Sequence, residues 1–242
     1  MKQNTQNGNA IILILVAIAL FAALGYAFSN SSRTSSSFLS DAEAEAYANQ
    51  IIAYGNDVKS AVKRLQLRGC SDTEISFENN QSTTIGGYLN VTRNDCFVFD
   101  TQGGGLQFKQ FSENMLSPNV SIYGRYEAFF TGNTSIKGVG SDCESSECND
   151  LVLVKTHLKK SICEKINIAL NNNQSPDHIL EIDTNSIGVE NFNASNLYKY
   201  EPDRNIFNST TGELNGIKQG CVEGQINPGT GGYNYFQVLI AR

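Results

Sequence analysis

The sequence has no tryptophan, and its 242 residues include only two histidines, two methionines and four prolines. It has no G-x-S-x-G or H-E-x-x-H motif and no Cys-x-x-Cys pair, so the local signatures of α/β-hydrolases, zinc proteases and thiol oxidoreductases are missing. Lysine and arginine are not clustered: 24 acidic and 16 basic residues follow Arg33, which gives this part a net charge of −8. These absences argue against an enzyme and against a nucleic-acid partner, because phosphate binding requires clustered cations.

The cysteines indicate an oxidising compartment. All six follow the first 69 residues, and an even number suits disulfide bonds. With two histidines, a zinc site would need thiolates from scattered positions, which typical ligand spacing disfavours. Two pairs are close along the chain, and the last two cysteines are then left to pair. The expected disulfides, one of the fifteen pairings that six cysteines allow, are Cys70–Cys96, Cys143–Cys148 and Cys163–Cys221.

One long apolar run is present, at residues 10–28. Its nineteen residues carry no charge, and as a helix they would extend about 28 Å, close to the thickness of a bilayer core. We therefore predict a polar leader at residues 1–9 and a transmembrane helix at residues 10–28. Lys2 and the amino terminus carry more positive charge than Arg33 alone. This bias places the leader on the inner side of the cell membrane and the residues after the apolar run in the periplasm or outside the cell. A secretory signal peptide cleaved after Ala27 is the alternative.

The leader ends in Gly8, the apolar run follows at once, and an amphipathic helix and a larger domain come next. In this order of segments the first seventy residues resemble the start of a type IV pilin or pseudopilin. The resemblance implies cleavage between Gly8 and Asn9 by a prepilin peptidase. The family usually has Phe or Met at the new first position and Glu at the fifth, where this chain has Asn9 and Leu13, so the resemblance implies a minor, tip-type subunit. The C-terminal stretches GCVEGQ and YNYFQVLIAR are similar to uncharacterised membrane-anchored bacterial proteins.

A serine-rich segment follows the apolar run. Seven of the nine residues at 29–37 are Ser or Thr, which compete for backbone hydrogen bonds and weaken a helix. We therefore expect a linker at residues 29–39 and a single extracytoplasmic domain at residues 40–242.

An amphipathic helix is predicted at the start of this domain, at residues 41–67. Ser40 and Glu43 have the spacing of a capping box, and Gly69 follows the last apolar position. Apolar side chains recur every three or four residues and form one stripe. We expect the stripe to pack on its own domain, and the alternative is a seam shared with neighbouring copies. The stripe consists of Tyr47, Ile51, Tyr54, Val58, Val62 and Leu65.

Beyond residue 70 the apolar runs are short and are separated by Asn, Ser and Gly, a pattern typical of antiparallel strands. One further helix is expected at residues 159–171, where Ile and Leu recur among polar residues. The strongest strand is expected at residues 233–241, because aromatic and branched side chains dominate it. The other predicted strands are 75–77, 96–99, 106–108, 123–130, 135–139 and 150–155.

Few side chains are candidates for a site. His157 follows an apolar run and His178 lies near a proline, and neither has an evident catalytic partner, so no catalytic or cofactor-binding residue is assigned. The weak calcium candidate is the acidic segment around Cys143 and Cys148, because oxygen ligands on a closed loop suit calcium. A solvated acidic turn is the favoured alternative, since the EF-hand pattern is absent. The four carboxylates are Asp142, Glu144, Glu147 and Asp150.

These features predict an α+β protein: an N-terminal transmembrane helix, an amphipathic helix, and an extracytoplasmic antiparallel-sheet head with one further helix. The resemblance predicts a pilin-like or pseudopilin-like structural subunit of an envelope filament or secretion machine. Its partners would be the membrane and other pilin-like subunits or further copies of itself, with no cofactor. A monomeric membrane-anchored or secreted binding protein is the alternative, and an extracytoplasmic hydrolase is third.

Overall fold

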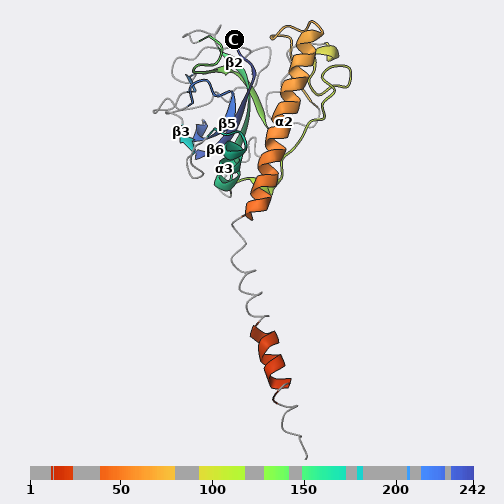
Figure 1. The fold of residues 1–242 in the computed structure, drawn as a ribbon. Coiled ribbons are helices and arrows are strands. Elements are labelled where there is room, and N and C mark those ends of the chain that lie inside the picture. The colour runs from red at the N-terminus through yellow and green to blue at the C-terminus, as the bar shows by residue number, and fades with distance from the viewer. Residues whose placement is uncertain are drawn as a thin grey trace, which may run out of the picture. The chain divides into compact units, whose positions relative to one another are not determined.

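The computed structural model describes residues 12, 14–23, 39–79, 93–117, 128–141, 149–172, 179–181, 206–207, 214–226 and 230–242. The chain divides into two compact units, Met1–Asp41 and Ala42–Arg242. In the first unit, residues 12 and 14–23 are helical (Figure 1). Their side chains are exposed. Among the helices within these ranges, none is long and apolar enough to cross a membrane. The predicted span at 10–28 and linker at 29–39 lie partly outside the described residues, and the leader at 1–9 lies wholly outside them.

The predicted amphipathic helix is confirmed as α2 (Asp41–Leu67). Gly69 ends it with a φ of +92°, a left-handed conformation that glycine adopts at little cost. The amide of Gly69 donates to the carbonyl of Gln66 at 3.0 Å, and the amide of Cys70 donates to the carbonyl of Leu65 at 3.1 Å. These are the two hydrogen bonds of a Schellman motif, so the chain turns directly from α2 into the loop that begins at Cys70.

The apolar stripe of α2 packs on its own domain, as expected. The buried residues of the helix are Ala44, Ala48, Ile51, Tyr54, Gly55, Val58, Ala61, Val62 and Leu65. The alternative, a seam shared with neighbouring copies, is wrong for Ile51, Tyr54 and Val58. Each of these side chains is at most 5% exposed, so it is not accessible to a second copy.

The second unit contains a six-stranded sheet in the order β3-β5-β6-β2-β1-β4. Figure 1 labels four of these strands, β2, β3, β5 and β6. The four central strands pair antiparallel, whereas the two-residue strands at the edges pair parallel to their neighbours. With α2 and α3 (Lys160–Ala169), this sheet confirms the α+β fold class. The strands are β1 (Phe129–Ile136), β2 (Asp150–Leu158), β3 (Leu180–Glu181), β4 (Ile206–Phe207), β5 (Gln219–Ile226) and β6 (Thr230–Ile240).

Both helices lie against the same face of the sheet. Tyr235 of β6 lies beside Gly55 of α2, and Tyr235 pairs directly with Cys221 of β5. Directly paired residues point to the same face, and Cys221 is disulfide-bonded to Cys163 of α3. The other face carries an apolar cluster that consists of Ile136, Val139, Val152, Val154, Leu214, Val222, Phe236 and Val238. The alternation of Tyr235, Phe236 and Gln237 therefore divides β6 between a helix-covered face and this cluster.

Several strand predictions are confirmed and others are wrong. The predicted strands at 150–155 and 233–241 correspond to β2 and β6. β1 includes the first two residues of the predicted strand at 135–139 and the last two of the one at 123–130, of which residues 123–127 lie outside the described residues. The predicted strands at 75–77, 96–99 and 106–108 do not form ladders. These segments contain one isolated bridge between Ser76 and Phe97, and η1 (Asn94–Cys96) is a 3₁₀ turn. Ile75, Phe77 and Val98 of these segments are buried. A loop closed by a disulfide can bury such side chains without a regular strand.

Candidate functional site

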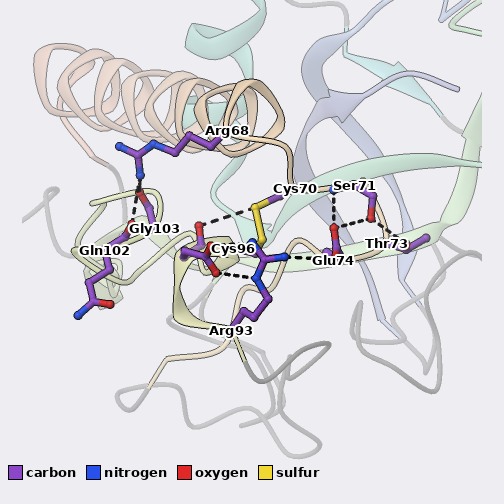
Figure 2. The surroundings of a disulfide bond; sticks show 10 residues. Arg68, Cys70, Ser71, Thr73, Glu74, Arg93, Cys96, Gln102 and Gly103 are labelled. Atoms are coloured by element: carbon purple, nitrogen blue, oxygen red, sulfur yellow. Dashed lines mark hydrogen bonds and ion pairs between the residues drawn. A yellow bond between two sulfur atoms is a disulfide. The ribbon is translucent and has the colours of Figure 1, made fainter.

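The loop that follows α2 forms a small lobe, residues 70–79 and 93–108, which we call the stapled lobe. The predicted disulfide between Cys70 and Cys96 is confirmed and closes it, with an S–S distance of 2.06 Å and a Cα–Cα distance of 5.8 Å (Figure 2). Both cysteines are buried. The bond joins the end of α2 to η1, so the short segments between them are held together without a sheet ladder.

Arg64 in the last turn of α2 and Arg68 directly after the helix bind a glycine turn of the stapled lobe. Arg64 Nη2 donates to the carbonyl of Gly104 at 2.6 Å, and Arg68 Nη1 donates to the carbonyls of Gly103 at 2.6 Å and Gln102 at 3.1 Å. Figure 2 shows Arg68 reaching this turn. The amides of Gly103 and Gly104 donate to backbone carbonyls within the turn, so they are not available to cradle a phosphate.

An exposed ion cluster lies next to the disulfide (Figure 2). Arg93 donates to both carboxylate oxygens of Asp95, at 3.0 and 2.6 Å, and lies 3.7 Å from Glu74. Hydrogen bonds from the amide and hydroxyl of Ser71 lower the pKa of Glu74, and the Arg93 guanidinium lowers the pKa of Asp95. Both carboxylates therefore remain ionised at neutral pH. The cluster holds the lobe in shape and shows no acid or base suited to catalysis.

An open cleft of about 720 Å³ lies on the stapled lobe, within the size range of small-molecule sites. We call it the aromatic cleft. Its apolar lining consists of Phe97, Phe99, Leu106 and Phe108. Ring contacts connect this lining to the domain core: Phe99 lies 5.3 Å from Phe108 and 5.9 Å from Phe130 of β1. Phe130 in turn stacks on Phe77 with centroids 3.9 Å apart, and both rings are fully buried. The apolar wall is thus positioned by the core.

The polar lining of the aromatic cleft has one sign of charge. Glu78 and Asp100 contribute carboxylates, and among the residues that the structure describes no lysine, arginine or histidine lines the cleft. The amide of Gln102 donates to Asp100 Oδ1 at 2.8 Å, which orients this carboxylate. Uncharged donors and acceptors complete the lining, namely Asn79, Asn94, Thr101 and Gln107. Such a surface disfavours anionic ligands and is compatible with cationic or neutral ones.

A second polar group of side chains lies between α2 and the sheet. Gln237 Nε2 donates to Asn56 Oδ1 at 3.0 Å, the Tyr235 hydroxyl donates to Gln237 Oε1 at 2.7 Å, and Gln219 Nε2 donates to the Tyr235 hydroxyl at 2.8 Å. Burial raises the pKa of Tyr235 well above its usual range, so the phenol stays neutral. These polar side chains bind one another between α2 and the sheet, which indicates a structural role. These hydrogen bonds could not be predicted from the sequence, because the residues that they join are up to 181 positions apart.

A lysine in β2 is also buried on the α2-covered face. Lys155 is fully buried, and its Nζ donates to the carbonyl of Thr156 at 3.1 Å and lies 5.7 Å from the centroid of the Phe111 ring. A cation over an aromatic face is stabilised by the ring quadrupole. Lys155 lies at the end of the strand predicted at 150–155. Nothing in that segment indicates its contact with Phe111, which comes from a distant loop.

His157 occupies a strained position at the end of β2. Its φ is +61°, its backbone amide donates to Asn234 Oδ1 at 3.2 Å, and its Nδ1 lies 2.7 Å from the Thr156 hydroxyl. That hydroxyl is fully buried, so no substrate could reach it as a nucleophile. These contacts support the interpretation of His157 as a structural residue. His178 lies outside the described residues.

The pKa of His157 makes stability depend on pH. Burial, and then the charge of Lys155, lower this pKa below the usual 6.5. Between the folded and unfolded pKa values the unfolded chain binds more protons, so the stabilisation is present above pH 6.5 and lost as the pH falls. Replacing His157→Asn, which tolerates a positive φ, should therefore reduce the loss of stability between pH 7 and pH 5. Urea unfolding at both pH values measures this, and an unchanged pH dependence would contradict it.

The acidic calcium candidate is only partly described. Asp142, Glu144, Glu147 and the predicted Cys143–Cys148 disulfide fall outside the described residues, as do the processing residues Gly8 and Asn9. Asp150 is fully buried in β2, and its two oxygens accept hydrogen bonds from the amides of Ile136 and Arg242, each at 3.0 Å. Asp150 therefore joins β1 and the C-terminal residue to β2. Within the described ranges, no three His, Cys, Asp or Glu side chains gather in a way that could hold a metal.

The predicted disulfide between Cys163 and Cys221 is confirmed, with an S–S distance of 2.02 Å. Asn167 of α3 reinforces it, since its side chain donates to the carbonyl of Cys221 at 2.7 Å and accepts from the amide of Cys221 at 2.8 Å.

The chain matches no protein-family model, and neither a curated protein nor a solved structure shows significant similarity to it.

Proposed function

We propose that the protein is a pilin-like or pseudopilin-like structural subunit of an envelope filament or secretion machine. The observation that carries the proposal is the order of segments. A polar leader ending in Gly8 and an apolar run at 10–28 precede α2, a 27-residue helix whose inner face packs on an antiparallel sheet. An apolar segment suited to a membrane would hold such a subunit in place, with the disulfide-bonded head in the periplasm or outside the cell.

Assembly through the apolar segment fits the burial of α2. Apart from the half-buried Tyr47, the stripe of α2 is buried against its own domain, so Ile51, Tyr54 and Val58 are not accessible to another copy. In the segment before it, small residues lie among bulky ones, and small side chains let membrane helices approach closely. These small residues are Ala17, Ala19, Ala22, Ala23 and Gly25. Leu13 stands where the resemblance would place a carboxylate, so we propose a minor subunit whose association depends on helix shape.

Cross-linking tests this proposal. Single cysteines placed at positions 14 to 24 should form cross-links between copies or to a partner subunit in the membrane. Ala19→Leu or Ala23→Leu should reduce the cross-linked fraction severalfold, because a larger side chain separates the helix backbones. Ile18→Leu is the matched control, since it keeps the hydrophobicity and size of a bulky position. The absence of all cross-links, or equal cross-linking in the alanine variants, would contradict assembly through this segment.

The mature N-terminus separates this function from the alternatives. Mass spectrometry of the protein from its native membrane should find a chain that begins at Asn9, as prepilin processing requires. A chain that begins at Phe28 would indicate signal-peptide cleavage and a secreted protein.

A second candidate function is a membrane-anchored binding protein, and the aromatic cleft is the observation that favours it. The cleft has a suitable volume, an apolar wall and a polar rim. A monomer that binds a small ligand without cross-links in the apolar segment would support this candidate over the first.

A further inference from the structure

We propose that the aromatic cleft binds an organic cation, a small molecule or short side chain that carries an ammonium or guanidinium group next to an apolar body. This inference goes beyond the structural role proposed above. It rests on the lining of the cleft and does not depend on assembly in the membrane.

The apolar wall supplies the first part of the recognition. Phe97, Phe99 and Phe108 line the cleft, and all three rings are half-buried, so part of each remains open to a ligand. The edge-to-face contact of Phe99 with Phe108, and the contact of Phe99 with the buried Phe130, position the Phe99 and Phe108 rings before any ligand arrives. A positioned ring loses little conformational entropy on binding, and its face attracts a cation. The wall therefore suits an apolar body with a positive group beside it.

The carboxylates supply the second part. Asp100 is half-buried, and the Gln102 amide binds its Oδ1, which orients the carboxylate on the cleft wall. Glu78 adds a second acidic side chain to the lining, and no basic side chain lines the cleft within the described part of the chain. The nearby Arg93 is bound to Asp95 and Glu74. A phosphate or carboxylate ligand would therefore meet the negative charge of Asp100, whereas an ammonium group would gain a charge-assisted hydrogen bond to it.

The volume and the rim restrict the size of the ligand. A cleft of about 720 Å³ accommodates a molecule with an aromatic ring and a short chain, or one basic side chain of a peptide. Asn94, Thr101 and Gln107 are exposed at the rim and can donate or accept hydrogen bonds with the remainder of such a ligand.

Two probes of similar size and opposite charge test the proposal: phenethylamine and phenylacetate. Equilibrium dialysis with the full-length protein in a neutral detergent at pH 7 should show saturable binding of phenethylamine. Its affinity should exceed that of phenylacetate at least tenfold, the ratio expected from one charge-assisted hydrogen bond. Equal or tighter binding of phenylacetate, or no binding of phenethylamine, would overturn the proposal.

Variants locate the bound cation. Asp100→Asn keeps an oxygen that accepts from the Gln102 amide but removes the charge, and it should weaken phenethylamine binding about tenfold. Phe108→Leu should weaken it about threefold through loss of the ring. Asp57→Asn, an exposed position of α2 that does not line the cleft, is the matched control and should leave the affinity unchanged. Unaltered affinity in a folded Asp100→Asn variant would overturn the assignment, and the melting temperature shows whether that variant is folded.

Discussion

Removing the Cys163–Cys221 disulfide by replacing both cysteines with alanine should lower the free energy of unfolding by about 4 kcal/mol. The two cysteines are 58 residues apart, and a cross-link over a loop of that length restricts the unfolded chain by about this amount. The bond also joins α3 to β5, which are further connected by the two hydrogen bonds between Asn167 and Cys221. Urea unfolding of the purified protein, with the slope m compared between variants, measures the loss.

The Cys70–Cys96 disulfide is the internal control for this prediction. It closes a loop of 26 residues, for which the same chain-entropy argument gives about 3.5 kcal/mol. Alanine at both of these positions should therefore destabilise the protein slightly less. The chain-entropy account requires the Cys163–Cys221 cross-link to restrict the unfolded chain. A loss below about 1 kcal/mol for the variant without this disulfide would contradict that account.

Local patterns predicted the elements whose signals lie within one segment. The limits of α2 follow from an apolar period of three to four residues and from Gly69, which adopts the positive φ that ends the helix. β2 and β6 are runs of branched and aromatic residues, and α3 lies inside the predicted range 159–171. Two of the three predicted disulfides are confirmed, because proximity along the chain and elimination are informative when few cysteines remain.

β5 was not predicted, because its sequence lacks the residue pattern of a strand. Gly220 and Gly224 weaken a strand pattern, and no apolar alternation compensates for them. The compensation comes from distant residues: Asn167 binds both backbone groups of Cys221, and Asn172 Nδ2 donates to the carbonyl of Gln219 at 2.7 Å. A Cβ at Gly220 would lie 2.8 Å from Asn172 Nδ2, so the glycine allows this contact. Such pairings cannot be seen in a single segment.

The aromatic cleft was hidden for a different reason. Its apolar residues Phe97, Phe99, Leu106 and Phe108 occur in two short runs, which are typical of strands. In the structure the Gly103 turn brings the two runs together, and their rings form a wall instead of a ladder. Composition indicated burial correctly, but the tertiary contacts of Phe99 with Phe108 and Phe130 decide what the rings line.

Replacing Gly55 by alanine should lower the free energy of unfolding by roughly 2 kcal/mol, although alanine is the better helix former by about 1 kcal/mol. Gly55 lies in the buried face of α2, where a Cβ would collide with Gln237 Oε1 and the Tyr235 hydroxyl. Overpacking of this kind costs about 1–3 kcal/mol, and displacing the hydrogen-bonded pair adds to it. Thermal or urea unfolding of the variant measures the difference.

Two further variants determine whether the collision causes this loss. Ser60→Ala, an exposed position on the same helix, should be neutral or slightly stabilising, because it changes helix propensity without meeting the sheet. Tyr235→Phe removes the hydroxyl that lies against Gly55, so adding it to Gly55→Ala should cost less than the two single changes together. A Gly55→Ala variant that is more stable than the parent by about the propensity difference would mean that α2 does not approach β6 this closely. The helix would then be held by its apolar stripe alone, without the hydrogen bonds that join Asn56, Gln237 and Tyr235.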